Sequence, residues 1–188
     1  MRMFVALVPP APAVEDLDAF LAVRRESGDF RWTRAEHLHL TVAFLAEVPV
    51  RRLDDLGEGL GLAAARRTPF AAVVAGGGAF PDPTRARVLY AGLGLDDDGQ
   101  TELDRLAAGR RAAAARAGLE VDGQRFRPHV TIARCGRPSE VTPWVRLLDG
   151  YRGPTWQADR ITLLASHLGR SRQRPRYEEV ETFRLGRD

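Results

Sequence analysis

HLTVAFL at residues 39–45 and HVTIARC at residues 129–135 are two copies of one short pattern, and they decide how this chain folds. Each copy places a histidine and a threonine two residues apart within a run of apolar residues. That alternation predicts a β-strand, and in a strand residues i and i+2 face the same side. Each copy therefore presents one imidazole and one hydroxyl to one face, while its apolar residues face the other.

The two histidine–threonine pairs together suit acid–base chemistry on a phosphodiester. If the two strands lie side by side, His39, Thr41, His129 and Thr131 form a pocket with two imidazoles and two hydroxyls. One histidine can take a proton while the other gives one, without a metal ion. Free histidine titrates near pH ~6.5, so both protonation states are accessible at neutral pH.

The composition excludes several other chemistries. The chain has 188 residues and contains no lysine, so all 28 basic residues are arginine. A covalent lysyl–nucleotide intermediate, a Schiff base and a P-loop each need a lysine amine. Arginine suits phosphate because its planar fork donates two parallel hydrogen bonds. A net charge of +3 is too small to predict strong non-specific binding to nucleic acid.

The cysteine content and the hydropathy of the chain indicate the cellular compartment in which the protein resides. Cys135 is the one cysteine, which excludes an internal disulfide and a zinc site built on several cysteines. The apolar residues 3–8 are followed at once by prolines, which is not a secretory pattern. No apolar run approaches the roughly 18 residues that span a bilayer. We therefore expect a cytoplasmic protein that does not associate with membranes.

The order of elements indicates a duplication without a linker between the halves. The first half predicts a strand at 3–8, a helix from Pro12, the motif strand at 37–45, a helix near 53–60 and a strand at 70–74. The second half predicts a strand at 87–93, a helix at 96–117, the motif strand at 128–134, a helix near 140–148 and strands near 155–157, 161–166 and 177–185. The glycines at 76–78, together with Pro81 and Pro83, predict a turn. We expect one domain, residues 1–188, made of two pseudo-symmetric lobes.

With both motifs placed, the chain resembles the 2H phosphoesterase superfamily. Its flanking residues resemble those of the RNA 2′,3′-cyclic phosphodiesterases, also called 2′-5′ RNA ligases. The matching stretches are RW at 31–32, HLHLTVAFL at 37–45, GAFP at 78–81, RVLY at 87–90, FRPHVTIAR at 126–134, and LLAS at 163–166 with Tyr177. Two motifs in this order and at this spacing, with these flanks, form a specific signal that covers nearly the whole chain. His37 departs from the family pattern, which more often has asparagine or another polar residue there.

The resemblance implies a fold and an activity. The fold is α+β and bilobal, with two antiparallel sheets on either side of a central cleft. The activity is hydrolysis of a terminal 2′,3′-cyclic phosphate to a 2′-phosphomonoester, with His39 as the proton donor and His129 as the proton acceptor. Thr41, Thr131 and Arg134 are implied to bind the phosphate. In reverse, the same groups could join a cyclic end to a 5′-hydroxyl in a 2′-5′ linkage.

The resemblance also implies the partners. They are RNA ends or small nucleotides that carry a 2′,3′-cyclic phosphate, with no cofactor and no metal. We expect a monomer without an obligate protein partner. A phosphodiesterase of small cyclic nucleotides and a non-catalytic RNA-end binding module are competing interpretations. The binding module would be marked by loss of a motif histidine or threonine, and this chain keeps all four.

Two polar residues near the motifs have competing interpretations. Strand alternation places Arg134 on the face opposite His129 and Thr131, so it reaches the phosphate only if a bulge or the strand end turns it inward. His37 shares the parity of His39, so a His-x-His metal site of a metallohydrolase competes with the metal-free mechanism.

Two aromatic residues are also ambiguous. Phe80 and Trp32 could stack a base at the cleft, as aromatic residues do in binders of single-stranded RNA, or pack in the core. Core packing is the interpretation that their sequence context favours.

Overall fold

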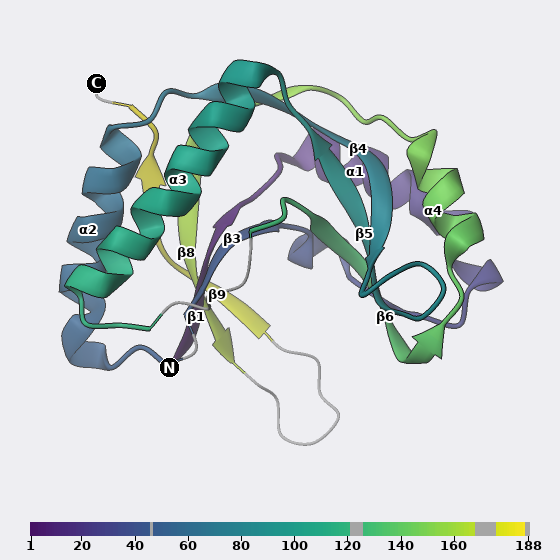
Figure 1. Cartoon of the computed structure of the whole chain (residues 1–188), viewed down its shortest axis with the longest axis horizontal. Helices are drawn as coiled ribbons and strands as arrows, with labels where there is room; N and C mark the ends of the chain where they lie inside the picture. The colour runs from purple at the N-terminus through teal and green to yellow at the C-terminus, as the bar shows by residue number, and fades with distance from the viewer. Residues whose placement is uncertain (46, 121–125, 168–175, 187–188) are drawn as a thin grey trace.

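A single antiparallel strand path runs through this protein, with helices beside both of its ends (Figure 1). The computed structural model describes residues 1–45, 47–120, 126–167 and 176–186. In these ranges the helices are α1 (Ala11–Ala22), α2 (Leu53–Ala65), α3 (Asp97–Arg116) and α4 (Thr142–Asp149). The strands are β1 (Arg2–Leu7), β2 (Arg31–Trp32), β3 (Leu40–Leu45), β4 (Phe70–Phe80), β5 (Ala86–Gly94), β6 (Val130–Ser139), β7 (Trp156–Ala158), β8 (Arg160–His167) and β9 (Arg176–Arg184). No helix in the described ranges is long and apolar enough to cross a membrane.

The strand order is symmetric about its middle. It runs β7-β4-β5-β6-β3-β1-β8-β9, and β2 pairs separately with β6. We call β3, β1, β8 and β9 the first wing, and β7, β4, β5 and β6 with β2 the second wing. Within the described ranges, β3 and β6 pair at one position, Leu40 with Val130. The expected α+β fold with antiparallel sheets is confirmed, and the two sheets are wings joined at this pair.

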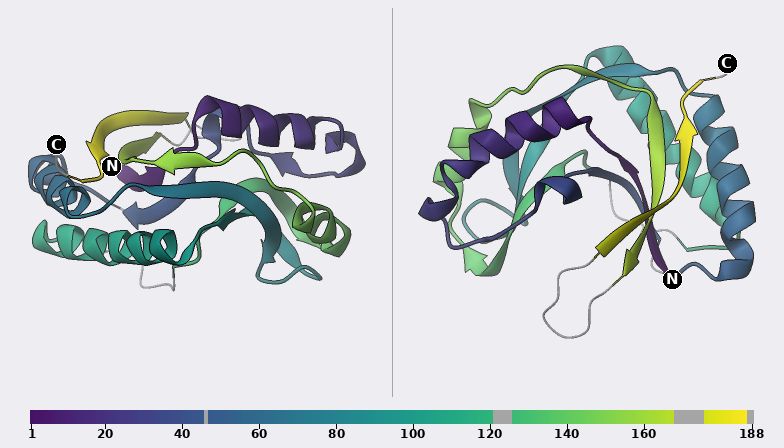
Figure 2. Two further views of the ribbon diagram at one scale, coloured as in Figure 1. Left: turned by 90° about the horizontal axis from the view of Figure 1, so that it is seen from above. Right: turned by 180° about the vertical axis from the view of Figure 1, so that it is seen from behind.

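The two halves of the sequence exchange elements between the wings. β4 belongs to the first half of the chain but pairs with β5, and β8 belongs to the second half but pairs with β1. Helix α3, which connects β5 to β6, packs mainly on α2 and contacts both β3 of the first wing and β4 of the second. Helix α1, which connects β1 to β3, contacts β4 of the second wing. Figures 1 and 2 show α2 and α3 beside the first wing and α1 and α4 beside the second. The repeated order of elements is therefore present, but neither wing is built from one half of the sequence.

Helix positions follow from their apolar stripes and caps. In α1, Ala13, Leu17 and Leu21 are buried, as a helical repeat of three to four residues predicts. Asp96 caps α3 by accepting a hydrogen bond from the Gly99 backbone N–H at 2.7 Å. Acidic residues in the first turn of α3 add a favourable interaction with the helix dipole.

The predicted turn at residues 76–83 is confirmed only in its proline part: β4 continues through the glycines to Phe80, and the chain turns at residues 81–85 before β5. Gly76 has a φ of +71° and lies where the β4–β5 register shifts, which is a bulge rather than a chain reversal. A Cβ at Gly77 would lie 2.5 Å from Leu148, and one at Gly78 would lie 2.3 Å from the Tyr90 hydroxyl. These glycines allow close approach of side chains to the strand, which the sequence pattern does not distinguish from a turn.

Strand β3 also begins later than predicted. It starts at Leu40 rather than at residue 37, because Ala35–His37 forms a short 3₁₀ turn. The motif strand of the second half likewise starts at Val130. Both motif histidines therefore lie immediately before their strands, at the point where the two wings meet.

Candidate active site

The two motif histidines meet at the junction of the wings. Leu40 pairs with Val130, and β3 runs antiparallel to β6. Continuing that register by one residue places His39 opposite Thr131 and His129 opposite Thr41. The apolar residues of both motifs are fully buried on the other face, as the alternation predicts. The expected juxtaposition of two imidazoles and two hydroxyls thus follows from a single strand pairing.

Both imidazoles are held by the same kind of hydrogen bond. His39 Nδ1 lies 2.7 Å from the carbonyl oxygen of His37, and His129 Nδ1 lies 2.7 Å from that of Arg127. A carbonyl oxygen only accepts, so each Nδ1 carries a hydrogen and donates it. Nε2 is then the nitrogen that gains or loses a proton. Neither Nε2 has a hydrogen-bond partner among the described residues.

Aromatic rings fix the planes of both imidazoles. The His39 ring stacks on Phe4, with centroids 4.7 Å apart, and meets Tyr177 edge-on at 5.5 Å. In the second wing, the His129 ring contacts Phe80 at 5.0 Å and Tyr90 at 5.3 Å. Each histidine is therefore wedged between two aromatic residues of its own wing. Nothing in the sequence pairs Phe4 with His39, because the contact joins residues that are far apart in the chain.

Burial weakens the basicity of both histidines in the ligand-free protein. It is the main cause that lowers the pKa of His39 to about 4, and the nearby charges of His37, His129 and Arg134 act in the same direction. Burial also lowers the pKa of His129, again with a contribution from Arg134. The Arg134 charge therefore lies close enough to influence both rings. An anion bound between these groups would oppose every one of the charge effects.

A bulge in β6 brings Arg134 to the face of the site. Tyr90 pairs with Thr131, but the preceding residue of β5 pairs with Ala133, so Ile132 is an extra residue in β6. The extra residue shifts the alternation, and Arg134 shares a face with Thr131. Strand parity alone predicts the opposite face, and the bulge is the condition under which this residue was expected to reach the phosphate.

Strand β3 has the same bulge at the matching position. Thr41 and Ala43 pair with successive residues of β1, so Val42 is extra. Phe44 consequently takes the place that Arg134 has in the other wing, and its side chain is 40% exposed. The symmetric backbone thus carries an arginine on one side of the motifs and an open aromatic ring on the other. Aligning the two motifs residue by residue would have found Phe44, which the sequence analysis did not single out.

A family model described as LigT-like phosphoesterase matches residues 8–90 and 93–177 of the chain. This protein belongs to the LigT-like phosphoesterase family. A relative named RNA 2′,3′-cyclic phosphodiesterase from Thermus thermophilus is 31% identical over 192 residues, which cover 98% of this chain and 90% of the relative. A relative of the same name from Geobacillus stearothermophilus is 31% identical over 132 residues, which cover 70% of this chain. That match spans only 41% of the Geobacillus relative's own length.

Solved structures of the family have the same fold as this protein. The crystal structure of Escherichia coli LigT complexed with 3′-AMP aligns with a TM-score of 0.78 and 27% sequence identity. The alignment covers 99% of this chain and 98% of that one. The resemblance stated from the motifs is thereby confirmed at the level of family and fold.

Other residues singled out from the sequence of this LigT-like phosphoesterase have varied surroundings. The His37 ring packs against Tyr177 with centroids 4.7 Å apart. Trp32 packs against Phe30 and Trp144, as the core interpretation predicts, whereas Phe80 contacts His129 directly. In the described ranges, no group of three or more histidine, cysteine, aspartate or glutamate side chains is arranged to hold a metal ion.

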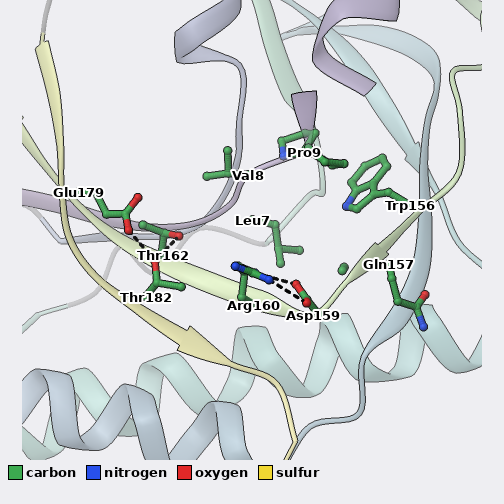
Figure 3. Close-up of a pocket in the computed structure, with 12 residues that line it drawn as sticks. Leu7, Val8, Pro9, Trp156, Gln157, Asp159, Arg160, Thr162, Glu179 and Thr182 are labelled. Atoms are coloured by element: carbon green, nitrogen blue, oxygen red, sulfur yellow. Dashed lines mark hydrogen bonds and ion pairs between the residues drawn. The ribbon is translucent and has the colours of Figure 1, made fainter. Parts of the chain in front are cut away.

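A separate cavity of this LigT-like phosphoesterase is lined by β1, β8 and β9 of the first wing and by β7 of the second (Figure 3). Its volume is about 750 Å³, and neither motif lines it. Thr162 and Thr182 share a hydrogen bond on one wall, and Arg160 pairs with Asp159 on another. These polar groups bond to one another, unlike the Nε2 atoms of the motif histidines. The junction of the wings, not this cavity, carries the groups suited to catalysis.

Proposed function

We propose that this protein hydrolyses the terminal 2′,3′-cyclic phosphate of RNA to a 2′-phosphomonoester, with two histidines as acid and base. The single observation that carries the proposal is the matched pair of imidazoles. Both are fixed through Nδ1, keep Nε2 without a hydrogen-bond partner among the described residues, and share one junction with two threonines and one arginine. The names of the relatives supply the substrate class.

The proposed reaction is one in-line displacement at phosphorus. Neutral His129 takes a proton from a water molecule through Nε2 as the water oxygen bonds to phosphorus. The bond from phosphorus to the 3′-oxygen breaks, and protonated His39 gives its Nε2 proton to that oxygen. The products are a 2′-phosphate and a 3′-hydroxyl, and solvent returns the two histidines to their starting states.

The remaining residues of the site stabilise charge. The hydroxyls of Thr41 and Thr131 donate hydrogen bonds to the non-bridging phosphate oxygens, and Arg134 offers its guanidinium to the same anion. These contacts strengthen as negative charge grows in the transition state. Because they are set on strands, they need little rearrangement when substrate binds.

The low pKa of His39 requires that substrate binding promotes protonation. At about 4 in the free protein, this pKa leaves His39 neutral at pH 7. A phosphodiester anion beside the ring favours the charged form and offsets the effects of Arg134 and His129. Substrate and proton therefore bind with positive coupling in this mechanism.

The same groups support the reverse reaction. A 5′-hydroxyl in place of water would attack the cyclic phosphate and form a 2′-5′ linkage. Hydrolysis outruns this ligation in ~55 M water, because both nucleophiles compete for the same intermediate complex by mass action. Each wing supplies one motif, so we propose that residues 1–188 act as one catalytic unit and that one copy of the chain suffices.

A phosphate-end assay tests the proposal. The substrate is a short RNA with a 2′,3′-cyclic phosphate, incubated with EDTA and with wild type, His129→Ala or His167→Ala. His167 bonds to Glu178 outside the site and serves as the matched control. We expect a 2′-phosphate from wild type and from His167→Ala only. A 3′-phosphate product, or activity that disappears with EDTA, would contradict the proposed mechanism, and the second result would favour the metallohydrolase.

A further inference from the structure

The short strand β2 places a second arginine beside the candidate phosphate site. Arg31 of β2 pairs directly with Arg134 of β6, and Trp32 pairs with Ala133. Residues opposite each other in an antiparallel pair share a face, with Cβ atoms about 4.5–5.5 Å apart. Arg31 therefore lies on the same face as Arg134, which the β6 bulge has turned toward Thr131.

The position of β2 is an asymmetric addition to the fold. β3 pairs with β6 only at Leu40, and beyond that point β2 takes the place alongside β6. In the described part of the chain, no strand takes the matching place alongside β3. The addition puts Arg31 on the edge of β6 that faces the first wing, the same edge along which β3 pairs with β6.

The pairing of Arg31 with Arg134 would be favoured by a bound anion. Like charges directly opposite in a sheet repel and destabilise the pair. Among the described residues, neither Arg31 nor Arg134 forms an ion pair with a carboxylate. Two other arginines close to Arg31 in the sequence do form ion pairs: Arg25 pairs with Asp18, and Arg34 pairs with Glu36. The two exposed guanidiniums at the site thus retain their full charge for a ligand.

A single bound phosphate would not use both Arg31 and Arg134 as ligands. The cyclic phosphodiester carries a single negative charge, and two threonines, a protonated histidine and Arg134 already surround it in the proposed mechanism. An RNA chain offers a second phosphate one nucleoside away from the reacting one. A cyclic mononucleotide lacks that group.

We propose that Arg31 binds the internucleotide phosphate next to the terminal nucleotide, and so makes the enzyme prefer RNA ends over cyclic mononucleotides. The proposal rests on the function proposed above and names its substrate class. Arg134 serves the reacting phosphate, and Arg31 serves the next phosphate along the chain. Two guanidiniums side by side can bind two successive phosphates of one RNA chain.

Three substrates that differ in one group test the role of Arg31. They are adenosine 2′,3′-cyclic phosphate, the dinucleotide ApA with a 2′,3′-cyclic end, and the same dinucleotide with an uncharged methylphosphonate linkage. Wild type should prefer the charged dinucleotide. Arg31→Gln should lower kcat/KM for that substrate by about 10-fold, the size expected for one charged hydrogen bond. For the other two substrates, kcat/KM should change by less than about 2-fold.

The kinetic parameter that changes is also diagnostic. A contact to a group outside the reaction centre is made equally in the ground state and the transition state, so KM should rise while kcat stays constant. Arg31→Lys should restore part of the loss, because it keeps the charge without the planar fork. Arg134→Gln should instead lower activity on all three substrates.

Arg87→Gln is the matched control. Arg87 is exposed and precedes Val88, which pairs with Arg134, so it projects from the opposite face of β5. The Arg87→Gln substitution removes the same charge as Arg31→Gln and should leave kcat/KM unchanged for all three substrates. Equal loss on all substrates for Arg31→Gln, or no loss on any, would overturn the role of Arg31 while leaving the proposed function intact. Failure of wild type to hydrolyse any of the three would overturn the proposed function itself.

Discussion

Leu40 and Val130 pair across the junction of the two wings, and each directly follows a motif histidine. Both side chains are buried, with exposures of 1% and 0%. Because the strands run antiparallel, this pair sets how His39 and His129 face each other. The geometry of the candidate site therefore depends on packing beneath it, on the face that substrate does not touch.

Truncation at this pair should separate stability from activity. Leu40→Ala and Leu60→Ala both remove a buried leucine, and each should lower the free energy of unfolding by about 2–5 kcal/mol. Only Leu40→Ala should also lower kcat, because Leu60 lies in α2, away from the junction. Urea unfolding and initial rates, measured where both variants remain folded, check this. Equal kcat in the two variants would show that the pair does not position the histidines.

A glycine in β4 should be needed for the position of His129. A Cβ on Gly78 would lie 2.3 Å from the Tyr90 hydroxyl, and the Tyr90 ring contacts His129. Gly78→Ala should therefore displace Tyr90 and lower kcat by about 10- to 100-fold, since small misplacements of a catalytic group are costly. Gly136→Ala in β6 is the control, because its Cβ would meet nothing within 4 Å. Steady-state rates of the two variants should differ accordingly, and full activity of Gly78→Ala would refute the link.

The pH dependence of the rate should differ between kcat/KM and kcat. kcat/KM reports the ionisations of the free enzyme, where burial lowers the pKa values of His39 and His129 below 6.5. With one ring charged and the other neutral, the profile should be bell-shaped with a maximum below pH 6.5. The bound phosphodiester raises both pKa values, so the maximum of kcat should lie at higher pH. Rates over pH 4–9 test this, and a flat kcat/KM between pH 5 and 8 would argue against two coupled histidines.

Arg134 should contribute to that profile. Its positive charge lowers the pKa of both histidines. Arg134→Gln should therefore move the acidic limb of kcat/KM to higher pH while reducing the rate. An unchanged limb in the same pH series would place Arg134 too far from the rings to act on them.

Acid should destabilise the protein through His39. Its pKa is about 4 when folded and about 6.5 when unfolded, so the unfolded state binds more protons between these values. The free energy of unfolding should thus fall as pH drops from 6.5 to 4. From pH 7 to 4.5, wild type should lose about 2–3 kcal/mol more than His39→Gln does. Urea titrations at the two pH values measure the difference.

The sequence predicted most elements and the meeting of the two motifs, because both leave periodic patterns. It did not predict which helix covers which wing. The exchange of α1 and α3 depends on packing between distant segments, and their apolar stripes would suit either wing. The paired strands were correctly expected to bring His39 and His129 together, since a repeated motif in a duplicated fold is placed by symmetry.

The errors near the site have local causes. A bulge residue such as Val42 or Ile132 looks like any other apolar strand residue, so the alternation beyond it is misread. This is why Arg134 had an uncertain face and Phe44 escaped notice. The glycines of β4 predict a turn by composition, and only the positions of Tyr90 and Leu148 explain why they lie in a strand.

Single-turnover rates of RNA cyclic-phosphate opening by wild type, His39→Ala, His129→Ala and the double variant test the two-histidine mechanism most directly. Each single substitution should lower the rate by about 10²–10⁴, the range for one general acid or base. The double variant should be little slower than the slower single variant, because the two groups act as a unit. Full activity in either single variant would contradict the mechanism.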